Sequence, residues 1–199
     1  MSKTTIPTGG ITDDAINLTS KVTGALPVAN GGTALTSGFA NGVTAAHNWR
    51  LTSSLNPSST DTAEFFTANL EQVDTTGQGT LGTAMSQSSG VFTFPSTGIW
   101  LCGMTLYAFD NANYQYVYGE INVTTNNSSY TEIAQSALNG EDGSAQRESS
   151  LYVQSTIDVT NTTNVKVKFG YTAATTGVNI FGNSARNSTN MIFIRLGDT

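Results

Sequence analysis

One apolar segment, Ile99 to Phe109, constrains the fold of this chain more than any other feature. It is apolar at both odd and even positions, and the turn residues Gly98 and Asp110 bound it. Its aromatic residues and the turn residues at its ends favour a strand over a helix. A strand that is apolar on both sides must be covered on both faces. We therefore expect a sheet whose outer face is covered by a neighbouring subunit.

The composition excludes an all-α protein. The 199 residues include 32 Thr, 20 Ser and 18 Asn, and charged residues make up 11% of the chain. Long amphipathic helices and coiled coils need a much larger share of charged residues on their solvent-facing sides. Threonine together with Val, Ile, Phe and Tyr is typical of strands. We predict an all-β protein.

The charge distribution excludes two classes of partner. The net charge is -6 and no run of basic residues occurs, so we expect no binding to nucleic acid and no attachment to a membrane. The apolar segment is too short to span a bilayer, and the first residues lack the apolar region of a signal peptide. Cys102 is the sole cysteine, so an internal disulfide is impossible and we expect assembly in a reducing cytoplasm.

Residues 1–60 differ from the rest of the chain. They are rich in Gly, Thr, Ser and Asn, and their apolar residues stand singly. Such a segment has too few large apolar side chains to close a core of its own. We predict an extended N-terminal anchoring arm over residues 1–60 and a head over residues 61–199. The apolar residues expected to anchor the arm are Ile11, Ile16, Val22, Leu26 and Val28.

From about residue 63 onward, apolar and aromatic segments alternate with turn signals. This pattern predicts about eight strands and no helix, as in an antiparallel sandwich, jelly roll or barrel. In 151–159 and 165–171 apolar side chains alternate with polar ones, so each of these strands has one solvent-facing side. The other expected strands lie at 65–70, 91–95, 99–109, 114–123 and 191–196.

Four segments of the head carry a family resemblance: Phe66–Leu70, Gly90–Trp100, Leu151–Val167 and Asn187–Leu196. Their order and spacing resemble the trimeric jelly-roll head shared by complement-type and tumour-necrosis-factor-type proteins. The resemblance covers about residues 63–196. It implies an antiparallel jelly-roll sandwich that assembles as a homotrimer.

The arm carries a second resemblance. Lys21–Thr33 is similar to a linker common in tailed-phage fibre proteins, and Gly10–Ile16 is similar to short repeats in the same proteins. Together with the acidic, Thr- and Asn-rich head, this resemblance implies a structural protein of a bacteriophage virion that is assembled in the host cytoplasm.

The residues expected at the subunit interface come from the doubly apolar strands and from a stripe of tyrosines. Strands without a polar side are candidates for burial against another copy of the chain. The tyrosines Tyr114, Tyr116 and Tyr118 either pack within a three-fold interface, which we favour, or form a platform for sugars. The interface candidates are Trp100, Cys102, Met104, Leu106, Tyr116 and Phe193.

Catalytic and metal-binding patterns are weak. His47, the sole histidine, lies in the predicted arm without a serine or carboxylate in a triad-like arrangement. One Cys and one His are too few for a zinc site. The pairs Asp13–Asp14 and Glu141–Asp142 lie in turn-like segments, and at the second pair a solvated turn is favoured over a calcium site. We expect no enzymatic activity, no cofactor and no metal.

These features predict a non-enzymatic virion protein, a trimeric short fibre whose arm binds other virion proteins and whose head attaches to the host surface, including its glycans. Two alternatives remain: a capsid decoration protein of the cement or head-fibre kind, and a carbohydrate-binding module. Recognition is expected in polar loops, because loops tolerate change without unfolding the scaffold. The receptor-contact candidates are Asn113, Tyr114, Glu141, Asp142, Arg147 and Arg186.

Overall fold

A computed structural model describes residues 42–110, 115–139 and 147–199, and of Asp110 and Arg147 it describes the backbone. These ranges contain 13 strands and no helix, which confirms the all-β prediction. In chain order the strands are β1 (Ala45–Leu51), β2 (Ser53–Leu55), β3 (Glu64–Phe65), β4 (Leu70–Gln72), β5 (Ser86–Ser88), β6 (Val91–Thr93), β7 (Gly98–Asp110), β8 (Tyr116–Thr124), β9 (Thr131–Asn139), β10 (Arg147–Val159), β11 (Lys166–Ala173), β12 (Asn179–Asn183) and β13 (Asn190–Gly197).

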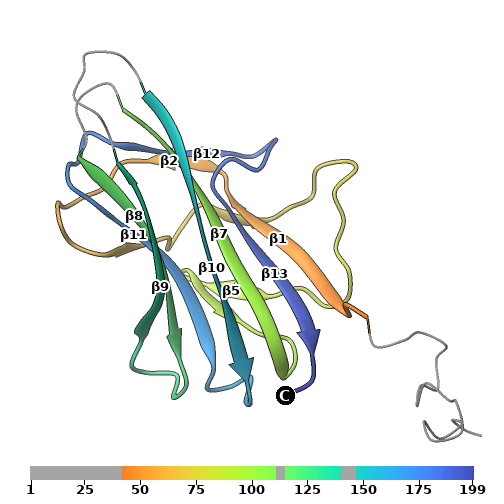
Figure 1. Cartoon of the computed structure of the whole chain (residues 1–199). Coiled ribbons are helices and arrows are strands. Elements are labelled where there is room, and N and C mark those ends of the chain that lie inside the picture. Colours follow the sequence, from red (N-terminus) through yellow and green to blue (C-terminus); the bar gives the residue numbers. More distant parts are fainter. Residues whose placement is uncertain (1–41, 111–114, 140–146) are drawn as a thin grey trace, which may run out of the picture. The chain divides into compact units, whose positions relative to one another are not determined.

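The strands form two antiparallel sheets. Sheet A has the order β2-β12-β7-β13-β1-β4, and β10 pairs with β7 along its whole length. Sheet B has the order β5-β6-β11-β8-β9, and the short β3 also pairs with β11. In Figure 1, β10, β7, β13 and β1 lie side by side in one layer, while β9, β8 and β11 form the other. This two-layer arrangement confirms the predicted antiparallel sandwich.

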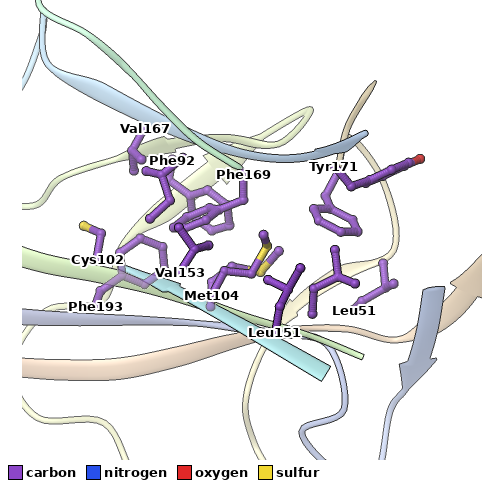
Figure 2. Close-up of a cluster of buried hydrophobic side chains, with 14 of the residues drawn as sticks. Leu51, Phe92, Cys102, Met104, Leu151, Val153, Val167, Phe169, Tyr171 and Phe193 are labelled. Carbon is purple, nitrogen blue, oxygen red and sulfur yellow. The ribbon is translucent and has the colours of Figure 1, made fainter. Parts of the chain in front are cut away.

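The hydrophobic core fills the space between the two sheets (Figure 2). Successive side chains of a strand point to opposite faces, so the even-numbered residues of β7 enter the core while the odd-numbered ones face outward. Phe193 of β13 meets Phe92 and Phe169 of sheet B, with ring centroids 5.0 and 5.7 Å apart. Each such aromatic pair contributes about 0.5–1.5 kcal/mol beyond its buried area, so these contacts hold the layers together.

The head begins earlier in the chain than residue 61. β1 is an interior strand of sheet A, paired with β13 on one side and β4 on the other, and Leu51 at its end has no exposed surface. Arg50 is 1% exposed and forms ion pairs with Glu71 at 2.6 Å and Asp74 at 2.8 Å. The predicted arm over residues 1–60 is therefore too long. The compact head spans Val43–Thr199, and an arm can include at most the residues before it.

The expected strand at residues 65–70 is divided between the two sheets. Glu64 and Phe65 pair with β11 in sheet B, whereas Leu70 pairs with Leu51 in sheet A. Asn69 has a φ of 56°, in the left-handed region that Asn tolerates, and the chain turns there. The turn between β5 and β6 packs closely on this segment, because a Cβ at Gly90 would lie 1.9 Å from the carbonyl oxygen of Phe66.

The other expected strands occur at β6, β7, β8, β10, β11 and β13. No strand is expected from the sequence at β9, and the structure explains why. Most side chains of β9 are exposed, because it pairs with β8 on one side and is an edge strand of sheet B. An edge strand with little buried surface has no strong apolar alternation to reveal it.

The two ends of the sandwich differ in what they carry. Ala45, at the start of β1, pairs with Arg195 near the end of β13, so the head's N-terminal and C-terminal residues lie at one end, the arm end. The opposite, distal end holds the paired Asp110 and Arg147 and the paired Tyr116 and Asn139. β7 has 13 residues and runs from the arm end to the distal end, a span of about 40 Å.

Candidate functional site

Five of the predicted interface residues lie inside the core of a single chain. Trp100, Cys102, Met104 and Leu106 are the inward-facing residues of β7, and Phe193 is their counterpart on β13. All five have an exposed fraction of 0%, so no part of their surface is available to another subunit. The prediction that they form the interface is wrong, because it selected the core-facing side of each strand. Figure 2 shows Cys102, Met104 and Phe193 within this core.

The opposite side of the same two strands forms a partly exposed apolar surface. Ile194 pairs across the strands with Leu101, and Ile192 pairs with Gly103. The hydroxyl end of Tyr152 on β10 reaches over Gly103, because a Cβ there would lie 2.5 Å from the tyrosine oxygen. We call this surface the apolar face; its residues are Ile99, Leu101, Tyr152, Ile192 and Ile194. All five residues lie in strands, and their side chains are half-buried or exposed.

Tyr116 lies on the outer side of the other sheet. Tyr116 and the apolar face of sheet A lie on opposite sides of the sandwich and cannot form one flat interface. The prediction that Tyr116 shares an interface with the other five candidates is therefore wrong. The rings of Tyr116 and Tyr118 are stacked with centroids 4.6 Å apart and planes 28° apart. Tyr116 donates its hydroxyl to the carboxylate of Asp61, and this hydrogen bond raises the pKa of Tyr116. Tyr114 lies outside the described residues.

Two polar groups continue this surface along sheet B. The carboxylate of Glu120, a residue that is 3% exposed, accepts a 2.6 Å hydrogen bond from the hydroxyl of Thr172. The ammonium of Lys168 lies 3.9 Å from the ring centroid of Tyr130 and 5.2 Å from that of Phe65. The tyrosine platform, as we call Tyr116, Tyr118, Glu120 and Thr172, is thus flanked by a lysine held between two aromatic rings.

Most predicted receptor-contact residues cannot be placed. Arg186 is described, and its guanidinium lies 5.9 Å from the ring of Phe181. That ring contacts Tyr107 and Phe109 near the distal end of β7, with centroids 5.5 and 6.0 Å away. A hydrogen bond to Glu148 raises the pKa of Tyr107. The candidates Asn113, Tyr114, Glu141 and Asp142 lie outside the described residues, as does the side chain of Arg147.

The arm end carries an open hollow of about 470 Å³ beside the start of β1. Arg195 lines it, donating to the carbonyl of Thr97 at 2.9 Å and to the hydroxyl of Thr44 at 3.2 Å, and pairing with Asp198. The guanidinium is fully engaged within the chain, so the hollow does not offer a free cation. The anchoring candidates Ile11, Ile16, Val22, Leu26 and Val28 lie outside the described residues.

The sole histidine and the sole cysteine both have structural positions. His47 lies in β1 and not in an arm; its Nε2 accepts a 2.8 Å hydrogen bond from the backbone N–H of Met85, and its ring stacks on Phe193. Burial lowers the pKa of His47 to about 4 and raises the pKa of the Cys102 thiol. The described residues contain no cluster of three metal-ligating side chains. Among the described residues we also find no helix long and apolar enough to cross a membrane.

Comparisons with known proteins define the class of fold. No protein-family model and no curated protein sequence matches this chain. Murine APRIL is similar in structure, with a TM-score of 0.51 and 8% identity over 76% of this chain and 98% of that chain. Eiger TNF from S. frugiperda is similar with a TM-score of 0.52 and 10% identity over 77% of this chain and 93% of that chain.

The head therefore has a jelly-roll fold of the tumour-necrosis-factor type. This confirms the fold implied by the sequence resemblance. At 8–10% identity the likeness establishes the fold alone, and the role of the protein must be argued from its surfaces.

Proposed function

We propose that this chain is a non-enzymatic structural protein of a bacteriophage virion. In this proposal an N-terminal arm attaches a trimeric head to the particle, and the head contacts the host surface. The phage origin is supported by the likeness of Lys21–Thr33 to fibre linkers. The observation that carries the attachment role is the polarity of the head: the chain enters at the arm end, and the distal end lies about 40 Å away.

The apolar face supports self-association. It combines neighbouring residues of β7, β13 and β10 into one continuous surface, and leaving such a surface in water is unfavourable by about 25 cal/mol per Å². A second copy of the same chain covers it most simply, because closed symmetric assemblies bury the same surface on every subunit. We therefore assign the homotrimer contact to the apolar face of sheet A.

The absence of catalysis in the proposal is supported by the state of the two usual catalytic side chains. Nε2 of His47 is occupied by the Met85 N–H, and the Cys102 thiol is buried with a raised pKa. A general base must reach the proton that it abstracts, and a nucleophilic thiol must ionise and meet its substrate. Neither requirement is met by these two groups.

A competition experiment tests the attachment role. Purified full-length protein is added to host cells before the particles, and adsorption of the particles is measured. Attachment predicts that the protein reduces adsorption in proportion to its concentration. A capsid decoration protein predicts unchanged adsorption, together with particles that lose heat stability when the protein is removed. That second result would contradict the proposal.

A further inference from the structure

The tyrosine platform is a row of outward-facing groups on the outer face of sheet B. Tyr116, Tyr118 and Glu120 occupy alternate positions of β8, so their side chains leave the sheet on the same side. They begin at the distal end, where Tyr116 pairs with Asn139. The platform is therefore on the part of the head that the proposed attachment role presents to a host.

Tyr118 is half-buried, and its surroundings leave part of its ring accessible. Its cross-strand neighbours are Ala137 on β9 and Thr172 on β11, both of which are small. Directly paired side chains in a sheet lie about 4.5–5.5 Å apart, so a large neighbour at either position would cover the ring. With these two residues, the tyrosine ring projects beyond the groups beside it.

The rings are also fixed in orientation. The hydroxyl of Tyr116 is bound to Asp61, whose backbone N–H in turn donates to the carbonyl of Ala173 at 2.9 Å. The ring of Tyr118 stacks on that of Tyr116. A ligand that packs on these rings meets side chains that are already ordered, which lowers the entropic cost of binding.

Glu120 lies beside the rings in the same row. It is 3% exposed and its carboxylate accepts from the hydroxyl of Thr172, so it supports the platform and does not itself meet a ligand. The ligand-facing groups are the exposed parts of the two tyrosine rings. Aromatic rings are suited to a pyranose, whose C–H groups pack on them.

The charges on this face exclude an anionic ligand. Lys168 is held between Tyr130 and Phe65, and the ammonium of Lys166 donates to the carbonyl of Thr162 at 2.6 Å. Both lysines of β11 are thus engaged within the chain. Glu120 and Glu132 are acidic, and burial together with the charge of Glu120 raises the pKa of Glu132. Sulfated or phosphorylated glycans would meet negative charge without a free cation.

We propose that the tyrosine platform binds a neutral oligosaccharide. The C–H groups of the sugar pack on the exposed parts of the Tyr116 and Tyr118 rings. As a host-attachment site the platform rests on the proposed function, but the binding itself is a property of the purified protein. A row from Tyr116 to Asn122 is about 20 Å long, which is enough for several sugar units.

Titration of the full-length protein with oligosaccharides tests this proposal. The probes are maltohexaose, cellohexaose, mannohexaose and N-acetylchitohexaose, with a heparin hexasaccharide and a lysine hexapeptide as charged comparisons. We expect saturation-transfer NMR and calorimetry to detect binding of at least one neutral hexasaccharide and no binding of either charged probe. Failure of all four neutral hexasaccharides to bind, or tighter binding of a charged probe, overturns the proposal.

Variants locate the site. Tyr118→Ala should weaken binding about tenfold, whereas Tyr118→Phe, which keeps the ring, should change it less than about twofold. Tyr116→Ala should also weaken binding, and it gives a second test should Tyr118→Ala alter the fold. Tyr107→Ala, which removes an aromatic ring from the outer side of sheet A, is the matched control and should bind like the wild type. Equal affinity of Tyr118→Ala and wild type overturns the proposal.

The outcomes separate this proposal from the attachment role. If Tyr118→Ala loses sugar binding and still competes with particles for cells, the site exists but attachment uses other residues. If wild-type protein competes with particles and binds no neutral sugar, attachment stands and the platform proposal fails. If sugar binding depends on Tyr118 but the protein never competes, the attachment role fails and the binding site stands.

Discussion

The two sheets of the head share one core but present opposite chemistry on their outer faces. Sheet A carries Leu101, Ile192 and Ile194 on adjacent strands, whereas sheet B carries Tyr118 and Lys168. An apolar surface is removed from water by packing, while a surface of tyrosine rings and polar groups can recognise polar ligands. The two proposals thus place assembly on one sheet and recognition on the other. The predictions below test that separation, from the largest expected effect to the smallest.

Truncation tests whether sheet A needs the residues before position 61. A fragment of residues 61–199 lacks β1 and β2 of sheet A but retains every strand of sheet B. We expect it not to fold, because the loss of a central strand is comparable to the whole net stability of a domain, about 5–15 kcal/mol. A fragment of residues 43–199 should show a cooperative thermal transition by circular dichroism. A folded 61–199 fragment would show that β1 is dispensable.

Charge insertion on the two sides of β13 tests which side faces a partner. Ile192→Asp should give a folded head that sediments as a monomer, because the new charge is buried only when subunits associate. Phe193→Asp, one residue away, should unfold the chain, since an unpaired charge in the core costs about 3–5 kcal/mol.

Sedimentation and circular dichroism distinguish these two variants, and Gln135→Asp on the exposed edge strand of sheet B is the control. Gln135→Asp should leave both the fold and the oligomeric state unchanged. A trimer that survives Ile192→Asp and dissociates with Gln135→Asp would place the interface on sheet B. The roles proposed for the two sheets would then be exchanged.

Acid should weaken the attachment of β1 to the rest of the head through His47. Its pKa is about 4 in the folded protein and 6.5 as the ordinary value, so the unfolded chain binds a proton more readily. Stability is therefore full above about pH 6.5 and falls as the pH decreases towards 4, by about 3 kcal/mol. Protonation also removes the acceptor that binds the Met85 N–H.

Chemical denaturation at several pH values measures this contribution. His47→Gln should be less stable than wild type at pH 7 and should lose much of the additional slope between pH 6.5 and 4. The same slope in the variant and the wild type would assign the acid sensitivity to carboxylates, for example Glu64, whose pKa is lowered by hydrogen bonds from Ser58 and Ser59 despite the opposing effect of burial.

The smallest effect is expected at the distal end of sheet A. Arg186→Ala removes the guanidinium that lies over Phe181, and we expect a stability change within about 0.5 kcal/mol. If loops at this end contribute to attachment, competition with particles should weaken severalfold, and Arg186→Lys should restore it in part. Unchanged competition would leave the tyrosine platform of sheet B as the contact.

The sequence predicted the strands whose buried residues are apolar. It failed to predict strands whose buried residues are polar. β7 and β13 could be predicted because a long apolar run, in a chain with few helix-forming residues, is compatible with few structures other than a buried strand. β1 was missed because two of its buried residues, His47 and Arg50, are polar and are satisfied by partners far away in sequence. A linear pattern does not show such partners.

The interface residues were misplaced for a related reason. A strand that is apolar at both parities shows that both sides are covered, but it does not show which side faces the core. Trp100 and Leu101 are equally apolar in the sequence, and the choice between them is made by sheet B, which covers Trp100. Likewise the spacing of Tyr116 and Tyr118 placed them on one face, but the topology decided on which sheet that face lies.

The central position of β1 has a mechanical consequence. A head that is tethered at the arm end and held at the distal end is pulled along its strands. Ladder hydrogen bonds in antiparallel sheets lie perpendicular to the strands, so this tension loads those between β1 and its neighbours, β13 and β4, in shear. Bonds loaded in shear break together, whereas bonds at a peeled edge break one at a time. A tethered head with this topology is therefore built to withstand drag.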